Sequence, residues 1–227
     1  MAHFPSMTDS TTEPLLQNLF PDTVTSVFSA RLPADAVLVG VEQELSTRMA
    51  EKRYNEFLHG RHCARLALEA GGYAPVAIGK GEKREPLWPE QVSGSITHTG
   101  PYAAAVVGSS SLFTGLGLDI ETAKPLEEKL FKAICLPEEI ALFNPDSAGQ
   151  QAKLLFSIKE SIYKCLWPTV QSFIDFTEMR VTLNSDGHSY TAIPHTDKCP
   201  QELTARLQGR YMITDELVLS SAWINAT

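Results

Sequence analysis

The stretch GLGLDIET, residues 115–122, decides how the middle of the chain folds. Its three aliphatic residues alternate with two glycines and two acids, and this period of two predicts a β-strand. A strand turns every second side chain to the same face, so Asp119 and Glu121 point in one direction. Two carboxylates on one face repel each other unless a cation balances them or their pKa values rise.

Two interpretations of this acid pair remain open at the level of spacing. An edge strand could turn both acids to solvent, where their repulsion is screened. Alternatively, the pair could hold a cation. Carboxylates without a nearby histidine or cysteine suit a hard ion, and Mg²⁺ is the usual choice where phosphates complete the shell.

Length and composition narrow the class of protein. The chain has 227 residues, 43% of them hydrophobic, with 19 basic and 27 acidic residues and a formal net charge of −8. This balance argues against nonspecific nucleic-acid binding, although it leaves room for a local basic pocket. There is no run of 18 apolar residues, no signal-peptide pattern and no CxxC pair among the four cysteines. We therefore expect a cytoplasmic protein that does not span a membrane.

The patterns predict an N-terminal lead over residues 1–20, which looks loose, and a first half over residues 21–112. Its expected elements are strands at Thr23–Leu32 and Ala36–Val41, a helix at Thr47–Ala70, loop with a short strand at Val76–Glu90, and two strands around Gly100-Pro101. The helix ends at Gly71-Gly72, a strong stop.

The second half is expected over residues 113–227. Its elements are the opening strand, loop and short helix over 124–147, a helix at Gln150–Trp167 stopped by Pro168, and strands at Phe173–Leu183, Ser189–Ile193, Thr204–Ile213 and Leu217–Ile224. Asp186-Gly187 is a good hairpin turn. Each half offers one long helix and several strands, so the fold class is α+β.

The second long helix contains FSIKESIYKCLWP, residues 156–168. Glu160 and Lys164 lie one turn apart on a stripe with aromatic residues, which makes Glu160 a candidate third ligand for the cation. The alternative is a surface ion pair worth about 0.2–0.5 kcal/mol. Lys159 lies off this stripe, and either solvent or a phosphate could receive it.

The first long helix carries the basic residues Arg53 and Arg61. Arg61 shares a stripe with apolar residues, and Gly60 beside it allows close approach of another group. A guanidinium binds phosphate with two hydrogen bonds. The alternative is an arginine that reaches solvent or pairs with an acid.

Between the helix and the acidic strand, GEKREPLWPEQVSGSITHTG spans residues 81–100 and adds Arg84 and His98. A single histidine on a strand is more often hydrogen-bonded in a structural role than catalytic. In a regular strand Ser95 and Thr97 face away from His98, so these side chains could not all touch one ligand unless the strand ends near Thr97.

Four segments, residues 56–68, 81–100, 115–121 and 156–168, resemble in this order the signature blocks of the 4′-phosphopantetheinyl transferases. The resemblance is to the monomeric, double-domain class that serves nonribosomal peptide and siderophore synthesis. It covers about residues 50–168. It implies two similar α/β halves related by a pseudo-twofold, with a cofactor cleft between them.

The resemblance also implies roles for individual residues. Asp119, Glu121 and Glu160 would bind Mg²⁺, with Glu160 also a general base, and Lys164 would contact the coenzyme A phosphates and protonate the leaving group. The remaining matches surround the phosphates of coenzyme A: Arg53, Arg61, Arg84, Thr97 and His98. Thr97 replaces the usual serine and Phe156 replaces a frequent tryptophan, and both changes are mild.

The implied activity is Mg²⁺-dependent transfer of the phosphopantetheine arm of coenzyme A to a serine of an apo acyl or peptidyl carrier protein. Adenosine 3′,5′-bisphosphate would be released. We expect a monomer that binds no nucleic acid and docks the carrier near Leu126–Phe143, a segment that could equally be core. The alternatives are another Mg²⁺-dependent nucleotide-diphosphate transferase and a non-catalytic module that binds coenzyme A or the carrier.

Overall fold

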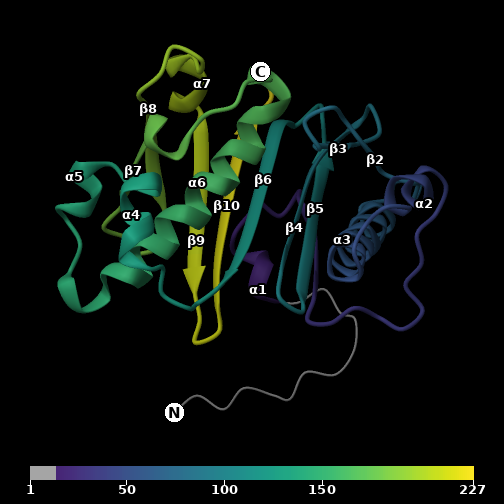
Figure 1. The fold of residues 1–227 in the computed structure, drawn as a ribbon. Coiled ribbons are helices and arrows are strands. Elements are labelled where there is room, and N and C mark those ends of the chain that lie inside the picture. Colours follow the sequence, from purple (N-terminus) through teal and green to yellow (C-terminus); the bar gives the residue numbers. More distant parts are fainter. Residues whose placement is uncertain (1–13) are drawn as a thin grey trace.

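The computed structural model describes residues 14–227, which form a mixed helix and sheet fold (Figure 1). Two three-stranded antiparallel sheets form its centre. The first, in the order β1-β5-β4, contains β1 (Thr25–Ser29), β4 (Val92–Thr99) and β5 (Tyr102–Ser109). The second, in the order β6-β10-β9, contains β6 (Phe113–Thr122), β9 (Leu207–Ile213) and β10 (Leu217–Asn225).

Each sheet is covered by one long helix. The helix α3 (Glu51–Ala70) packs on the first sheet, and α6 (Ala148–Val170) packs across β6 and β10 (Figure 1). The shorter helices are α1 (Pro14–Gln17), α2 (Val41–Ser46), α4 (Phe131–Ile134), α5 (Pro137–Ile140) and α7 (Gln201–Ala205). Single 3₁₀ turns are η1 (Glu128–Leu130), η2 (Pro145–Ser147) and η3 (Phe176–Glu178). Two small ribbons pair β2 (Gly79–Lys80) with β3 (Pro86–Leu87), and β7 (Met179–Leu183) with β8 (Tyr190–Pro194).

The two sheets meet where β4 runs beside β6. They are separate backbone ladders, and side-chain hydroxyls of β4 accept hydrogen bonds from the backbone of β6. Ser95 Oγ accepts from Leu118 N at 3.1 Å, and Thr97 Oγ1 accepts from Ile120 N at 3.3 Å. We call this contact the β4–β6 seam.

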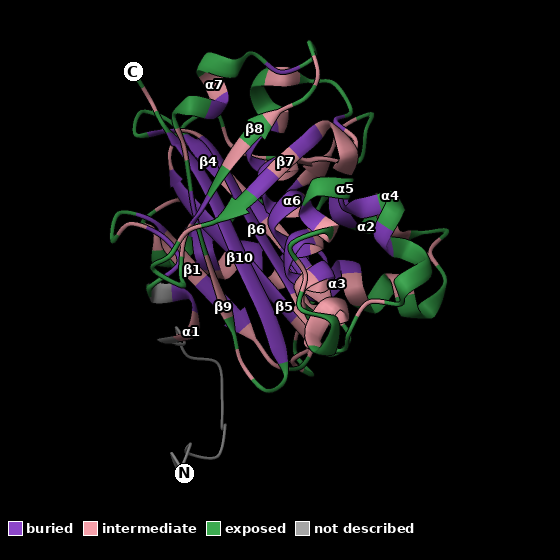
Figure 2. Cartoon of the chain, turned by 90° about the vertical axis from the view of Figure 1, so that its left-hand side faces the viewer, coloured by how far each residue is buried: buried purple, intermediate pink, exposed green. Residues whose placement is uncertain are grey.

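Alternate side chains of the strands pack into different apolar clusters on the two faces of the sheets. Ala104 and Val106 of β5 share one apolar cluster with Leu116 and Leu118 of β6, and with residues of α1 and β10. The opposite faces pack separately, the first sheet against α3 and the second against α6. The strands β5, β6 and β10 are therefore mostly buried, while β9 is largely exposed or half-buried and α7 and the outer turns are exposed (Figure 2).

Two glycines of β6 allow α6 to lie directly on the strand. A Cβ at Gly115 would stand 2.0 Å from the carbonyl oxygen of Cys165, and one at Gly117 only 1.8 Å from that of Ser161. No side chain fits at these distances, so backbone meets backbone. Asp119 is two residues beyond Gly117, on the same face of the strand, and therefore also faces α6.

The predicted α+β class and its long helices and central strands are confirmed, with several corrections. Ala36–Val41 forms no strand, and α2 begins where it would have ended. The first long helix starts at Glu51 rather than at Thr47. Pro168 does not end α6, which continues to Val170. A proline in the last turn removes only one late hydrogen bond, and Gln171 closes the helix in a left-handed conformation.

The expected loose lead is in part a packed segment. Leu16, Leu19 and Phe20 are buried in the cluster shared by both sheets, because three large apolar side chains gain more by packing than by staying in water. Residues 1–13 of that lead lie outside the described residues. None of the helices described over residues 14–227 is both long and apolar enough to cross a membrane.

Candidate active site

The acids of β6 face α6 from a strand that is flanked on both sides. β10 pairs with one edge through its backbone, and β4 lies along the other. Asp119 is only 4% exposed and Glu121, nearer the strand end, is half-buried. The interpretation of a solvent-facing edge strand is therefore wrong.

One oxygen of the Asp119 carboxylate is bonded and the other has no partner. Oδ1 accepts hydrogen bonds from Lys164 Nζ at 2.7 Å and from Thr97 Oγ1 at 3.2 Å. Oδ2 is buried and accepts no hydrogen bond. A buried carboxylate oxygen without a donor has lost its hydration with nothing in return. It is therefore the atom of this site best placed to receive a cation.

The other two predicted ligands have raised pKa values. Burial raises the pKa of Glu121 and the charge of Asp119 raises it further, while Lys153 opposes the shift through a hydrogen bond of 3.1 Å. Burial also raises the pKa of Glu160. Lys164 opposes that shift, and the charges of Asp119 and Glu121 add to it. The three acids therefore influence one another, and a cation among them would relieve their repulsion.

Lysines of α6 balance these acids in the structure. Lys164 contacts Asp119, and Lys153 contacts Glu121. Over residues 14–227, no three histidine, cysteine, aspartate or glutamate side chains stand close enough together to hold a metal ion as they are. Binding by the predicted set would therefore need a side-chain adjustment, and the metal ligands stay a prediction.

A pocket of about 230 Å³ is lined by Glu160 and by Lys164, the lysine that contacts Asp119. The β2–β3 ribbon (residues 79–87) and β4 form one wall, and α6 forms the other, with Glu160 and Lys164 among its lining residues. A smaller pocket of about 80 Å³, lined by aromatic and aliphatic residues of α6 and η3, also includes Glu160. Glu160 thus borders a mixed-charge pocket and an apolar one.

Arg84 lines the larger pocket from the turn of the β2–β3 ribbon. Its φ of 75° lies in the left-handed region, which an arginine adopts only at a cost. The turn is held by the bond from Arg84 N to Gly81 O at 3.0 Å and that from Gly81 N to Glu85 O at 2.9 Å. The ribbon therefore brings a strained arginine to the wall facing α6.

His98 and Arg53 contact each other across the first half. Arg53 Nη1 lies 2.8 Å from His98 Nε2, and it also contacts Glu56 at 3.3 Å. Burial lowers the pKa of His98, and the charge of Arg53 lowers it further. Because a guanidinium only donates, the neutral ring accepts at Nε2. Arg53 Nε is buried without a partner, so this pair keeps an unused donor.

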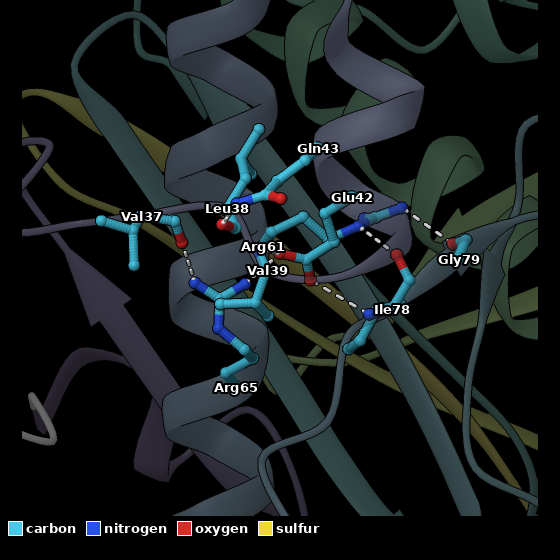
Figure 3. A network of polar contacts seen from close by, with 9 residues as sticks. All are labelled: Val37, Leu38, Val39, Glu42, Gln43, Arg61, Arg65, Ile78 and Gly79. Atoms are coloured by element: carbon cyan, nitrogen blue, oxygen red, sulfur yellow. Dashed lines mark hydrogen bonds and ion pairs between the residues drawn. The ribbon is translucent and has the colours of Figure 1, made fainter.

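Arg61 is engaged by the backbone at the base of the β2–β3 ribbon (Figure 3). Its Nε donates to Ile78 O at 2.9 Å and its Nη2 to Gly79 O at 3.0 Å, and its guanidinium lies over the Phe57 ring. The structure thus gives Arg61 partners within the protein, beside the phosphate contact that the resemblance implies.

Glu42 completes this network and was not identified from the sequence. The side chain is fully buried, and Oε1 accepts from Ile78 N at 3.0 Å while Oε2 accepts from Val39 N at 3.1 Å and from Arg65 (Figure 3). One residue, Ile78, is therefore held on both sides, with its N–H bonded to Glu42 and its carbonyl bonded to Arg61. Nothing in the sequence distinguishes Glu42 from the exposed Glu44 two residues on.

Lys159, for which solvent and a phosphate were both possible partners, is 3% exposed and is bonded within the protein. Its ammonium pairs with Glu139 at 2.6 Å and donates to the carbonyls of Ile134 and Phe176, at 2.9 Å each. Glu139 in turn accepts from Val181 N at 2.7 Å. This buried pair ties α6 to α4, α5 and β7, one residue from Glu160.

Two family models match this chain, one over each half. The model of the 4′-phosphopantetheinyl transferase N-terminal domain matches residues 41–108, and that of the 4′-phosphopantetheinyl transferase superfamily matches residues 115–218. The second match contains Asp119, Glu121, Glu160 and Lys164.

Several curated proteins are similar over much of their length. The 4′-phosphopantetheinyl transferase Npt of Nocardia iowensis is 34% identical over 91% of this chain and 98% of its own. PptT of Mycobacterium tuberculosis is 34% identical over 79% and 83%, and enterobactin synthase component D of Salmonella typhimurium is 37% identical over 60% and 58%. A solved holo-ACP-synthase from Plasmodium yoelii aligns with 51% of this chain at a TM-score of 0.39 and 14% identity, too low to bear on the fold. The chain belongs to the 4′-phosphopantetheinyl transferase superfamily and is a transferase of that family.

Proposed function

We propose that the protein transfers the phosphopantetheine arm of coenzyme A to a serine hydroxyl of an apo acyl or peptidyl carrier protein and releases adenosine 3′,5′-bisphosphate. The observation that carries this proposal is the unpaired, buried Oδ2 of Asp119 beside two acids with raised pKa values. The neighbouring pocket contains the cationic groups of Arg84 and Lys164, which a diphosphate requires.

The chemistry of the acids suits a magnesium ion, which they would hold after the side-chain adjustment described above. Asp119 Oδ2 offers a free, buried oxygen, and the half-buried carboxylates of Glu121 and Glu160 supply the remaining hard ligands. When bound, Mg²⁺ would neutralise the diphosphate and help align the reacting phosphorus for attack. Lys153 and Lys164 would keep the acids balanced before the ion and the cofactor arrive.

The basic residues would hold the anionic cofactor in the pocket. Arg84 and Lys164 line it directly, and Lys164 already extends to Asp119. Arg53, with its unused Nε, and the neutral His98 are candidates for the 3′-phosphate and the diphosphate. Arg61 would act at the same end of the pocket, through the ribbon that it holds and through any phosphate within its reach.

The chemical step needs a base for the serine and a stabiliser for the leaving group. The serine oxygen would attack the phosphorus that bears the pantetheine arm, and its proton would pass to Glu160, whose raised pKa suits a general base near neutral pH. The bond from that phosphorus to the bridging oxygen breaks, and its electron pair leaves with adenosine 3′,5′-bisphosphate. The Lys164 ammonium would stabilise and protonate that oxygen.

The architecture that we propose is two similar halves related by a pseudo-twofold, with the cofactor in the cleft between them. A pocket lined by elements of both halves supports this arrangement and supports action as a monomer. We place the reaction in the cytoplasm, which agrees with four cysteines that are all buried and unpaired.

One assay tests the proposal. The protein is incubated with coenzyme A, Mg²⁺ and an apo carrier protein, and the carrier is weighed by mass spectrometry. We expect the mass gain of one phosphopantetheine arm, and we expect chelation of the metal to abolish it. If several carriers gain no mass while coenzyme A still binds, the protein is a binding module. Consumption of coenzyme A or another nucleotide diphosphate without modification of the carrier would identify a different transferase.

A further inference from the structure

We infer that Thr97 is a positioning residue, and that its hydroxyl fixes the Asp119 carboxylate from the other half of the molecule. This inference deepens the proposed function and rests on it, because it concerns the acid that would hold the metal ion. It assigns to Thr97 a role different from the direct cofactor contact that the resemblance implies.

The geometry uses both functions of the Thr97 hydroxyl at once. Oγ1 donates its single hydrogen to Asp119 Oδ1 at 3.2 Å and accepts the N–H of Ile120 at 3.3 Å. The residue is 4% exposed. A hydroxyl has one hydrogen to give, so while it bonds Asp119 it has none for a phosphate.

The consequence falls on the orientation of the carboxylate. Lys164 of α6 and Thr97 of β4 both donate to Oδ1, so this oxygen is held from two sides. The plane of the group is thereby set, and Oδ2 is left as the free oxygen. Partners that orient a metal ligand in this way typically contribute ten- to a hundredfold in metal affinity or activity.

Ser95 supplies a matched comparison on the same strand. Its hydroxyl accepts from Leu118 N at 3.1 Å, as that of Thr97 does from Ile120, and the structure records no contact between Ser95 and Asp119. The two residues therefore share the role of joining β4 to β6, and only Thr97 has the additional bond to the acid.

The test uses the full chain with saturating coenzyme A and titrates Mn²⁺ as the metal probe by electron paramagnetic resonance. Thr97→Val keeps the branched shape and removes the hydroxyl, whereas Thr97→Ser keeps the hydroxyl. We expect Thr97→Val to weaken Mn²⁺ binding ten- to a hundredfold, Thr97→Ser to stay within about threefold of wild type, and Ser95→Ala to lower the thermal midpoint without weakening Mn²⁺ binding.

A double-mutant cycle protects the test against a general loss of structure. In an Asp119→Asn background, Thr97→Val should cause little further loss of Mn²⁺ affinity, because the two changes remove the same coupling. Thr97→Val that binds Mn²⁺ as wild type does but raises KM for coenzyme A would overturn the inference and make Thr97 a cofactor ligand. Equal losses for Thr97→Val and Ser95→Ala would also overturn it. If wild type itself binds no Mn²⁺, the proposed metal site fails, which is a distinct result.

Discussion

Glu42 and Asp119 are both buried carboxylates next to a long helix, and they differ in how completely they are bonded. Glu42 receives three hydrogen bonds, spread over both of its oxygens. Asp119 receives two, both on Oδ1, and Oδ2 receives none. A carboxylate whose oxygens are all satisfied holds the fold together, whereas one with a buried, unused oxygen keeps the capacity to bind something.

The same difference separates the two lysines of α6 that flank Glu160. Lys159 donates to three protein oxygens and its side chain is almost fully buried, while Lys164 is partly exposed and lines the larger pocket. Two lysines of one helix thus differ, because Lys159 is fully engaged within the protein and Lys164 keeps access to a pocket. Sequence spacing separates the two, with Lys164 on the stripe of Glu160 and Lys159 off it, and the structure adds the partners of each.

The largest effect is expected from Asp119→Asn, which keeps the shape and removes the charge. Transfer to the carrier should fall on the order of a thousandfold or more, because a catalytic metal ion contributes several kcal/mol to the transition state. The free energy of unfolding should change less than it does at Glu42. Initial rates of carrier modification and urea unfolding measure the two effects. Near-normal turnover of this variant would remove Asp119 from the metal site.

The reverse pattern is expected for Glu42→Ala. Removing one member of a buried ion pair leaves Arg65 and two backbone groups without their partner, so unfolding in urea should become easier by about 3 kcal/mol. Glu44→Gln, an exposed acid of the same helix, is the control and should be nearly neutral. A Glu42→Ala protein as stable as wild type would break the comparison with Asp119.

A third effect is the dependence of stability on pH, which we expect from the buried His59. His59 contacts Ser29 Oγ at 2.8 Å, and burial lowers the pKa of His59 from 6.5 to about 4. As the pH falls below 6.5, His59 is therefore protonated in the unfolded chain while it stays neutral in the folded chain. The stability that His59 contributes is complete above pH 6.5 and is lost as the pH falls towards 4, by on the order of 3 kcal/mol.

Urea unfolding at several pH values measures this loss. His59→Gln should flatten the stability profile between pH 6.5 and 4. The histidine interpretation fails if the profile of His59→Gln keeps its slope.

The smallest effect is expected from an exposed pair. Glu127 and Lys129 lie 2.6 Å apart, with side chains 68% and 73% exposed. Glu127→Gln should change the free energy of unfolding by no more than about 0.5 kcal/mol, because solvent already screens such a pair. The same urea assay measures it, and a loss above 1 kcal/mol would mean that bonding pattern alone does not rank the acids of this protein.

Much of the fold follows from the sequence because its strongest patterns are local. The helix before Gly71-Gly72 and the alternation in residues 115–122 both predict the observed elements. Ala36–Val41 misled because a short apolar alternation does not require a strand, and no neighbouring strand pairs with it. The end predicted for α6 at Pro168 was wrong because a proline in the last turn removes only one backbone hydrogen bond of the helix.

The sequence predicts which faces and helix turns the candidate residues share, but it does not predict their hydrogen-bond partners. Spacing predicts that Asp119 and Glu121 share a face and that Glu160 and Lys164 lie one turn apart. The partners of Thr97, Arg61 and Lys159 come from segments 17 to 25 positions away in the chain. Such contacts depend on how the helices and strands pack together, so the periodic patterns of a single sequence do not reveal them.

The glycine at position 117 has a consequence for how this site tolerates change. Because main-chain atoms of β6 and α6 touch there, the distance between the two backbones that carry Asp119 and Lys164 is set by the scaffold. Even alanine at this position would push α6 away from β6. The distances between side chains of the two elements, such as that from Lys164 to Asp119, would then increase. A saturation library should therefore recover glycine alone at position 117. The close contact of β6 with α6 depends on the absence of a Cβ atom at this position.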